Sequence, residues 1–79
     1  MPPLDARDIE AILRADGWFE VPGTRHRAFE HAEKPGKVNF SAGVRDVRKG
    51  TLLWRSIFHQ QAGLTDREVE RIYWEQVRG

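Results

Sequence analysis

The first hydrophobic positions of the chain follow a helical spacing. Ile9, Ile12 and Leu13 are separated by three and four residues, which lines apolar side chains along one face of a helix. Asp5 is a typical N-cap in front of this stripe. Gly17 is placed to end the helix in a left-handed conformation. The pattern predicts a helix between Asp5 and Gly17.

From Trp18 to about Ser41 the pattern changes to short runs of aromatic and β-branched residues separated by turn signals. Pro22-Gly23 is a turn signal, and Glu33-Lys34-Pro35-Gly36 is typical of a type II turn. These features predict an antiparallel meander of three strands, which are WFEV (18–21), roughly 25–31, and KVNFS (37–41).

The second half of the chain returns to helical spacing. Residues 41–50 have little periodicity, which indicates a connection. A helix after Gly50, ending at Gly63, is predicted from apolar positions Leu53, Trp54, Ile57 and Phe58. Thr65 and Glu68 form a capping-box pattern before a last helix, which is apolar at Val69, Ile72, Tyr73 and Val77.

The predicted order of elements is therefore αβββαα, without repeats or linkers. Three antiparallel strands need one face covered, and the helices supply that cover, which predicts a two-layer α+β sandwich. With 79 residues, a single domain covering 1–79 is expected.

The composition and hydropathy of the chain exclude some classes of protein and of metal site. The chain has no cysteine, which excludes disulfides and thiolate metal sites. No stretch approaches the roughly 20 apolar residues that cross a bilayer, and the start of the chain does not resemble a signal peptide. We therefore expect a soluble, cytoplasmic protein without a membrane association.

Charge is unevenly distributed. Residues 25–55 hold eight basic and three acidic residues, whereas residues 1–24 and 56–79 carry net charges of −3 and −1. Concentrated positive charge is what a phosphate-binding surface needs. Imbalances of this size also occur on ordinary solvated surfaces, so charge alone leaves both interpretations open.

Two of the three histidines lie in the stretch GTRHRAFEH (23–31). Strand alternation places His26 and Glu30 on one face and Arg27, Phe29 and His31 on the other. If Phe29 packs against the helices, His26 faces solvent. An exposed histidine beside a turn and among arginines is compatible with catalysis and also with no chemical role.

Two kinds of chemistry are disfavoured. His26 and His31 lie on opposite faces and cannot easily converge on one metal ion, so no metal or other cofactor is expected. No serine stands in a nucleophile-elbow motif. Acid–base chemistry on RNA stays open, because RNA supplies its own nucleophile and needs a proton-transfer group and cations.

Five short sequence motifs lie in order along most of the chain, from about Ile9 to Thr65. They are ILRADGW, RHRAFEH, HAEKPGKVNF, VRKGTL and QAGLT. In their order and spacing they resemble the HicA family of small bacterial toxins. The resemblance implies a fold like the double-stranded-RNA-binding domain, α-β-β-β-α, with an additional C-terminal helix. It also implies messenger-RNA endonuclease activity in a type II toxin–antitoxin system.

The resemblance also implies roles for particular residues. His26 matches the proton-transfer histidine, with Thr24 and Arg25 where the family usually has Gly and Ser. RNA contacts are expected at Arg25, Arg27, Arg45, Arg48 and Lys49. For Arg27, which shares the face of Phe29, a solvated strand charge is the alternative to a phosphate contact, and the residues alone slightly favour it. The implied partners are messenger RNA and a HicB-type antitoxin, with the chain a monomer alone or part of a hetero-oligomer.

Two other functions remain open from the residues. A non-catalytic module that binds RNA or a protein partner would use the same basic segment. Alternatively, the three tryptophans, Trp18, Trp54 and Trp74, permit a homodimer through the helices, although packing in the core is the more common use of tryptophan.

Overall fold

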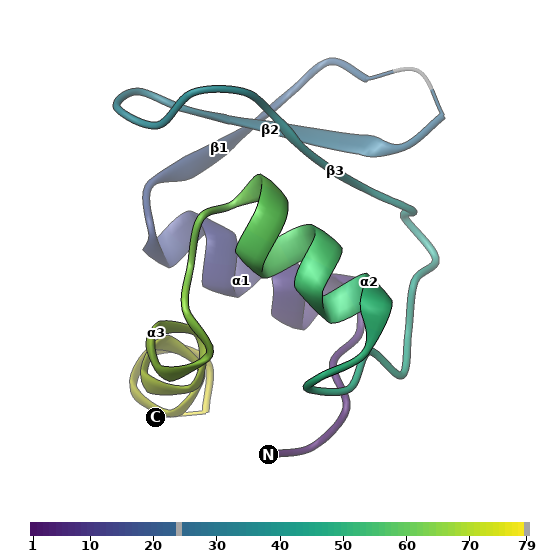
Figure 1. Ribbon diagram of the computed structural model, residues 1–79. Coiled ribbons are helices and arrows are strands. Elements are labelled where there is room, and N and C mark those ends of the chain that lie inside the picture. The colour runs from purple at the N-terminus through teal and green to yellow at the C-terminus, as the bar shows by residue number, and fades with distance from the viewer. Residues whose placement is uncertain (24, 79) are drawn as a thin grey trace.

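The computed structural model describes residues 1–23 and 25–78. It confirms the predicted order of elements in a small α+β domain (Figure 1). Two segments, named η, are π-helical and continue the α-helices that precede them. The elements are α1 (Ala6–Ala15), β1 (Trp18–Val21), β2 (Arg27–His31), β3 (Val38–Phe40), α2 (Leu52–Trp54), η1 (Arg55–Gln61), α3 (Asp66–Ile72) and η2 (Tyr73–Val77).

The first helix begins and ends where the sequence predicts. The Asp5 carboxylate accepts a hydrogen bond from the Asp8 backbone N–H at 3.0 Å, and Asp8 accepts one from the Asp5 N–H in return. These two bonds satisfy donors that a helix start leaves free. Gly17 follows the helix with a φ of 99°, so the chain reverses there and enters β1.

The sheet is an antiparallel meander in the order β1-β2-β3. Trp18 pairs with His31, and Phe29 pairs with Val38. Side chains on one face of the sheet, including Phe29, Val38 and Phe40, are buried. The predicted alternation is confirmed at Phe29, which lies in the core.

One side of the sheet is covered by α1 and by the helix formed from α2 and η1 (Figure 1). η1 contacts β3, while α3 and η2 pack against α1. A single apolar cluster joins these elements, and its largest fully buried side chains are Trp18, Trp54, Tyr73, Phe29 and Phe58.

The predicted connection between the sheet and the second helix is confirmed at residues 41–50. It is anchored to the start of the chain at two points: Val47 and Leu4 exchange two backbone hydrogen bonds of 2.9 Å, and the Ala6 N–H donates to the Val44 carbonyl at 3.0 Å. The side chains of Val47 and Leu4 are buried. The connection is therefore held against the start of the chain while its charged residues remain at the surface.

The second predicted helix differs from expectation at Leu53. Trp54, Ile57 and Phe58 are fully buried as predicted, but the prediction for Leu53 is wrong, because its side chain is 44% exposed. Leu52, its neighbour in α2, is also exposed, whereas Trp54 in the same turn is fully buried. The first turn of this helix therefore reaches the core through Trp54 alone.

The helical segment after α2 has wider turns than the predicted α-helix. The Ala62 backbone N–H donates to the Ile57 carbonyl, five residues back, at 3.0 Å. Bonds of that span define a π-helix. Thr51 caps the start of α2 by accepting from the Trp54 N–H.

The last helix begins with the predicted capping box between Thr65 and Glu68. Of the three tryptophans, Trp18 and Trp54 are buried, whereas Trp74 in η2 is 52% exposed. Core packing therefore accounts for two of the three tryptophans.

Candidate nucleic-acid interface

His26 lies at the end of the sheet, immediately before β2. The sequence predicts that the second strand begins near Arg25, but the strand begins at Arg27, and Arg25 and His26 form a bend. Both side chains are exposed. Thr24, expected in the place of a family glycine, lies outside the described residues. His26 thus projects from a turn.

Gly23 shapes this turn by a close approach of the backbone. A Cβ atom at Gly23 would lie 2.4 Å from the carbonyl oxygen of His26 and 3.4 Å from the Cβ of Ala28. No side chain fits at the first distance. The turn folds over Ala28, which is 5% exposed although it faces away from the helices. The position of His26 therefore depends on a glycine at residue 23.

The same end of the sheet leads into the basic connection. Arg27 pairs with Phe40 in the β2–β3 ladder, so the residues before β2 and those after β3 leave the sheet at the same end of the strands. The connection then runs from β3 to the start of α2 (Figure 1). Arg45, Arg48 and Lys49 are all exposed along it. The structure thus brings His26 to the beginning of the segment that holds three of the predicted RNA contacts.

The three basic side chains of the connection differ in their ionic partners. Arg48 pairs with Asp46 at 3.1 Å, and both side chains are more than 60% exposed. Lys49 pairs with Glu70 of α3 at 3.1 Å. Within residues 1–23 and 25–78, Arg45 has no ion pair, and it lines a surface hollow of about 340 Å³ together with Arg7. Arg45 is thus the most available cation of the three.

Arg27 has a different environment from the other predicted RNA contacts. Its guanidinium pairs with Glu10 of α1 at 2.7 Å and with Glu20 of β1 at 2.8 Å. It also lies over the ring of Phe29, 5.3 Å from the centroid. The two carboxylates raise the pKa of Arg27, and Arg27 lowers the pKa of both glutamates. The charge of Arg27 is thus balanced within the fold, which disfavours a direct phosphate contact.

His31 is held in a structural role. Its Nδ1 accepts hydrogen bonds from the backbone N–H groups of Glu33 and Lys34, at 3.0 and 3.1 Å. Its Nε2 lies 2.7 Å from the carbonyl oxygen of Asp16 and must therefore donate. The ring also packs edge-on against Trp18. Both nitrogens are occupied, so His31 joins the β2–β3 turn to the end of α1.

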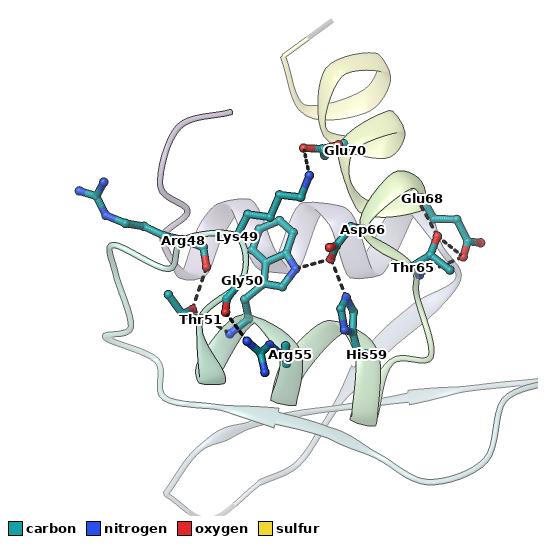
Figure 2. Close-up of polar contacts among 11 residues, drawn as sticks. Arg48, Lys49, Gly50, Thr51, Arg55, His59, Thr65, Asp66, Glu68 and Glu70 are labelled. Carbon is teal, nitrogen blue, oxygen red and sulfur yellow. Dashed lines mark hydrogen bonds and ion pairs between the residues drawn. The ribbon is translucent and has the colours of Figure 1, made fainter.

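The third histidine, His59, has a neighbour that sequence analysis missed. Its Nε2 lies 2.5 Å from Oδ1 of Asp66, at the start of α3. The same oxygen accepts a hydrogen bond of 2.7 Å from the indole of the buried Trp54. Figure 2 shows Asp66 facing His59 from the neighbouring helix. These two bonds, that of Trp54 first, lower the pKa of Asp66.

No signal in the sequence pointed directly to this pair. His59 and Asp66 are seven residues apart, but they lie in different helices, so helical spacing does not bring the two side chains together. The turn at residues 62–65 brings them together, and Leu64 in that turn is buried. A histidine near the end of one helix, followed by an aspartate at the start of the next, is the feature that could have indicated the contact.

Comparison with known protein families, with curated proteins and with solved structures finds no match to this chain. In the part of the chain that the structure describes, no helix is long and apolar enough to cross a membrane. Nor do the described residues contain a group of three or more His, Cys, Asp or Glu side chains that could hold a metal ion.

Proposed function

We propose that this protein is an RNA-cleaving toxin of the HicA type, with a fold like the double-stranded-RNA-binding domain. The observation that carries the proposal is the position of His26. Its exposed side chain lies beside exposed Arg25, at the end of the sheet where the basic connection begins. A strand of RNA bound along Arg45 and its neighbours would bring a phosphodiester to His26.

The proposed reaction is an internal transesterification of RNA. The ribose 2′-oxygen attacks phosphorus, and His26 takes the proton of that hydroxyl. The bond from phosphorus to the 5′-oxygen breaks, and the imidazolium returns the proton to the leaving oxygen. The products are a 2′,3′-cyclic phosphate and a 5′-hydroxyl. Arg25 and Arg45 would stabilise negative charge on the phosphoryl oxygens.

A protein partner belongs to the same proposal. A HicB-type antitoxin would inhibit the chain by covering His26 or the basic connection. The cations there are exposed, and those of Arg48 and Lys49 are each balanced by a single carboxylate. An acidic surface on the antitoxin would complement this segment, and such complementarity raises the rate of association. We place the complex in the cytoplasm, where messenger RNA is translated.

One observation favours a second function, that of a non-catalytic RNA-binding module. Among the hydrogen bonds of residues 1–23 and 25–78, none involves the ring of His26. Catalytic histidines are usually oriented by a partner on the second nitrogen. Binding of phosphates by the basic connection needs no such orientation.

The two functions are separated by an assay with purified protein and end-labelled RNA. The toxin proposal expects cleavage that His26→Gln reduces by about 100-fold or more, the usual contribution of a general acid or base, with RNA affinity unchanged. Undiminished cleavage by His26→Gln would contradict the assignment. RNA binding without any cleavage by the unaltered chain would favour the module.

The basic connection is tested in the same assay with matched charge variants. Arg45→Ala removes a cation without an ion pair in the described part of the chain, and we expect weaker RNA binding and a smaller salt dependence. Lys37→Ala is the control, because Lys37 is equally a surface cation but lies at the other end of the sheet and pairs with Glu30. Equal effects of the two variants would contradict a specific RNA path along the connection.

A further inference from the structure

His59 has the one feature that His26 lacks, a carboxylate that fixes its ring. Asp66 Oδ1 is 2.5 Å from Nε2 of His59, and Trp54 holds the same oxygen from within the core. Trp54 is fully buried, so Asp66 cannot turn away without leaving the indole N–H unpaired, which is costly in a core. The buried indole of Trp54 thus fixes the Asp66 carboxylate, which in turn orients the His59 ring.

This contact also determines which nitrogen of His59 holds the proton. The hydrogen bonds to Asp66 lower its pKa, so the carboxylate is ionised near neutral pH and can only accept. Nε2 of His59 must therefore donate. In the neutral ring the lone pair is then on Nδ1, and no hydrogen bond to Nδ1 occurs within the described residues. His59 thus presents a proton acceptor.

The surroundings of His59 can receive a ligand group. The His59 and Asp66 side chains are 36% and 37% exposed. Both border a surface hollow of about 380 Å³, together with Gly63, Leu64 and Thr65. The imidazole is therefore accessible from solvent while its orientation is fixed from the protein side.

Two basic side chains lie near the His59–Asp66 pair, although neither lines the hollow. Arg55 precedes His59 by four residues, and Figure 2 shows both side chains on the same helix. The Arg55 guanidinium donates to the Gly50 carbonyl at 2.9 Å and has no ion pair within residues 1–23 and 25–78. Its charge is not neutralised by that carbonyl. Lys49, paired with Glu70 beside Asp66 in Figure 2, adds a second cation.

We infer that His59, oriented by Asp66, is a second acid–base group of this protein, acting on a ribose hydroxyl whose phosphodiester is bound by Arg55. The inference rests on the proposed function, since the substrate is the same RNA. The basic connection begins at the end of the sheet beside His26 and ends at Gly50, whose carbonyl accepts a hydrogen bond from Arg55. One strand of RNA along it would present different phosphodiesters to the two histidines.

The step at His59 balances as at His26. Nδ1 takes the proton of the 2′-hydroxyl as its oxygen attacks phosphorus, and Nε2–H remains bonded to the Asp66 carboxylate. The bond from phosphorus to the 5′-oxygen breaks, and the Nδ1 proton passes to that oxygen. Asp66 is a positioning residue, because it contacts the imidazole and not the RNA.

Cleavage by paired variants tests the inference. We expect His26→Gln to retain a slower cleavage at a different position in the RNA. Adding His59→Gln should reduce that residual rate by about 100-fold or more, as for the loss of a general base. The glutamine amide can still donate to Asp66, which preserves the fold. Gln60→Ala, at the exposed neighbouring position, is the control and should leave the residual rate unchanged.

A second measurement does not depend on cleavage. In ¹⁵N NMR spectra of the histidine rings near neutral pH, His59 should show a proton on Nε2, and Asp66→Ala, which removes the acceptor, should weaken that preference. Adding a dinucleotide with a 2′-deoxyribose, which cannot be cleaved, should shift the His59 ring signals and leave those of His31 in place.

These results separate the two proposals. If the unaltered chain cleaves RNA but the residual rate of His26→Gln is zero or is unaffected by His59→Gln, the inference about His59 is overturned and the proposed function stands. If the chain does not cleave RNA, the proposed function fails. If the dinucleotide leaves the His59 signals in place, the inference fails on its own account.

Discussion

Gly17→Ala should be among the most destabilising single-methyl additions in this chain. Gly17 has a φ of 99°, and a Cβ there would lie 2.8 Å from Nε2 of His31. That nitrogen is already bonded to the Asp16 carbonyl at 2.7 Å. The added methyl therefore meets a ring whose two nitrogens are both engaged, and the ring cannot move without losing hydrogen bonds.

The expected cost has two parts. A side chain in left-handed backbone costs about 1–2 kcal/mol. Displacing His31 loses at least its bond to Asp16, and a typical hydrogen bond contributes about 1 kcal/mol. We expect Gly17→Ala to lower the free energy of unfolding by about 2–3 kcal/mol in total. This is a large share of the roughly 5–15 kcal/mol typical of small domains.

Urea unfolding of two variants at other glycines isolates the contact with His31. Gly50 has a φ of 87°, yet a Cβ there would meet nothing within 4 Å. Gly50→Ala should therefore show the backbone cost alone, about 1–2 kcal/mol. Gly43 has no positive φ and open space around it, so Gly43→Ala should be neutral or stabilising by about 0.4–1 kcal/mol.

Equal losses of unfolding free energy in Gly17→Ala and Gly50→Ala would show that the contact with His31 adds no cost. A double variant gives a second check. When His31→Ala removes the ring, the extra cost of Gly17→Ala should disappear, so the two changes should be less than additive. Additive effects would show that the His31 ring is not what the methyl group meets.

Two further predictions concern ion pairs and caps. Glu10 and Glu20 have pKa values lowered by hydrogen bonds from Arg27, so their stabilisation is complete above the ordinary value of 4.5 and is lost as pH falls below it. Arg27→Met should weaken this acid dependence of the unfolding free energy, and an unchanged pH profile would contradict the role of Arg27. Thr65→Ala removes the cap of α3 and should lower the unfolding free energy by about 1 kcal/mol. Unfolding in urea measures this change, and a value near zero would mean that the Thr65–Glu68 capping box contributes little.

The helix starts could be predicted from sequence because their causes are local. A cap depends on residues three positions apart, as at Asp5 and Thr65, and these signals survive in any packing. The same is true of Gly17, which ends α1 with a positive φ.

Features that depend on packing could not be predicted in the same way. Spacing alone placed Leu53 on the buried stripe, but in that turn of α2 only Trp54 reaches the core. The second strand is predicted to begin near Arg25, but β2 begins at Arg27. Before it, the backbone of Gly23 lies close to the His26 carbonyl, and a contact between backbone atoms leaves no pattern of side chains in the sequence.

For the candidate site, alternation correctly placed Arg27 with Phe29 on the covered face of β2. It could not show that Glu10 lies above that face, because Glu10 comes from another element, 17 residues earlier in the chain. The predicted RNA contacts therefore differ in their ion pairs. The charge of Arg27 is balanced by Glu10 and Glu20, whereas Arg45 has no ion pair within the described residues.

The three histidines differ in what occupies their ring nitrogens, and this difference decides what each can do. Backbone groups occupy both nitrogens of His31, so its ring has no site left for a substrate. A carboxylate occupies one nitrogen of His59 and leaves the other as an oriented proton acceptor. His26 is exposed beside Arg25, and in the proposed reaction only the bound RNA would orient its ring. The proposed catalysis at His26 would therefore require tight positioning of the substrate, whereas the His59 ring is already oriented by Asp66. If both act, changes that loosen RNA binding should impair cleavage at His26 more than cleavage at His59.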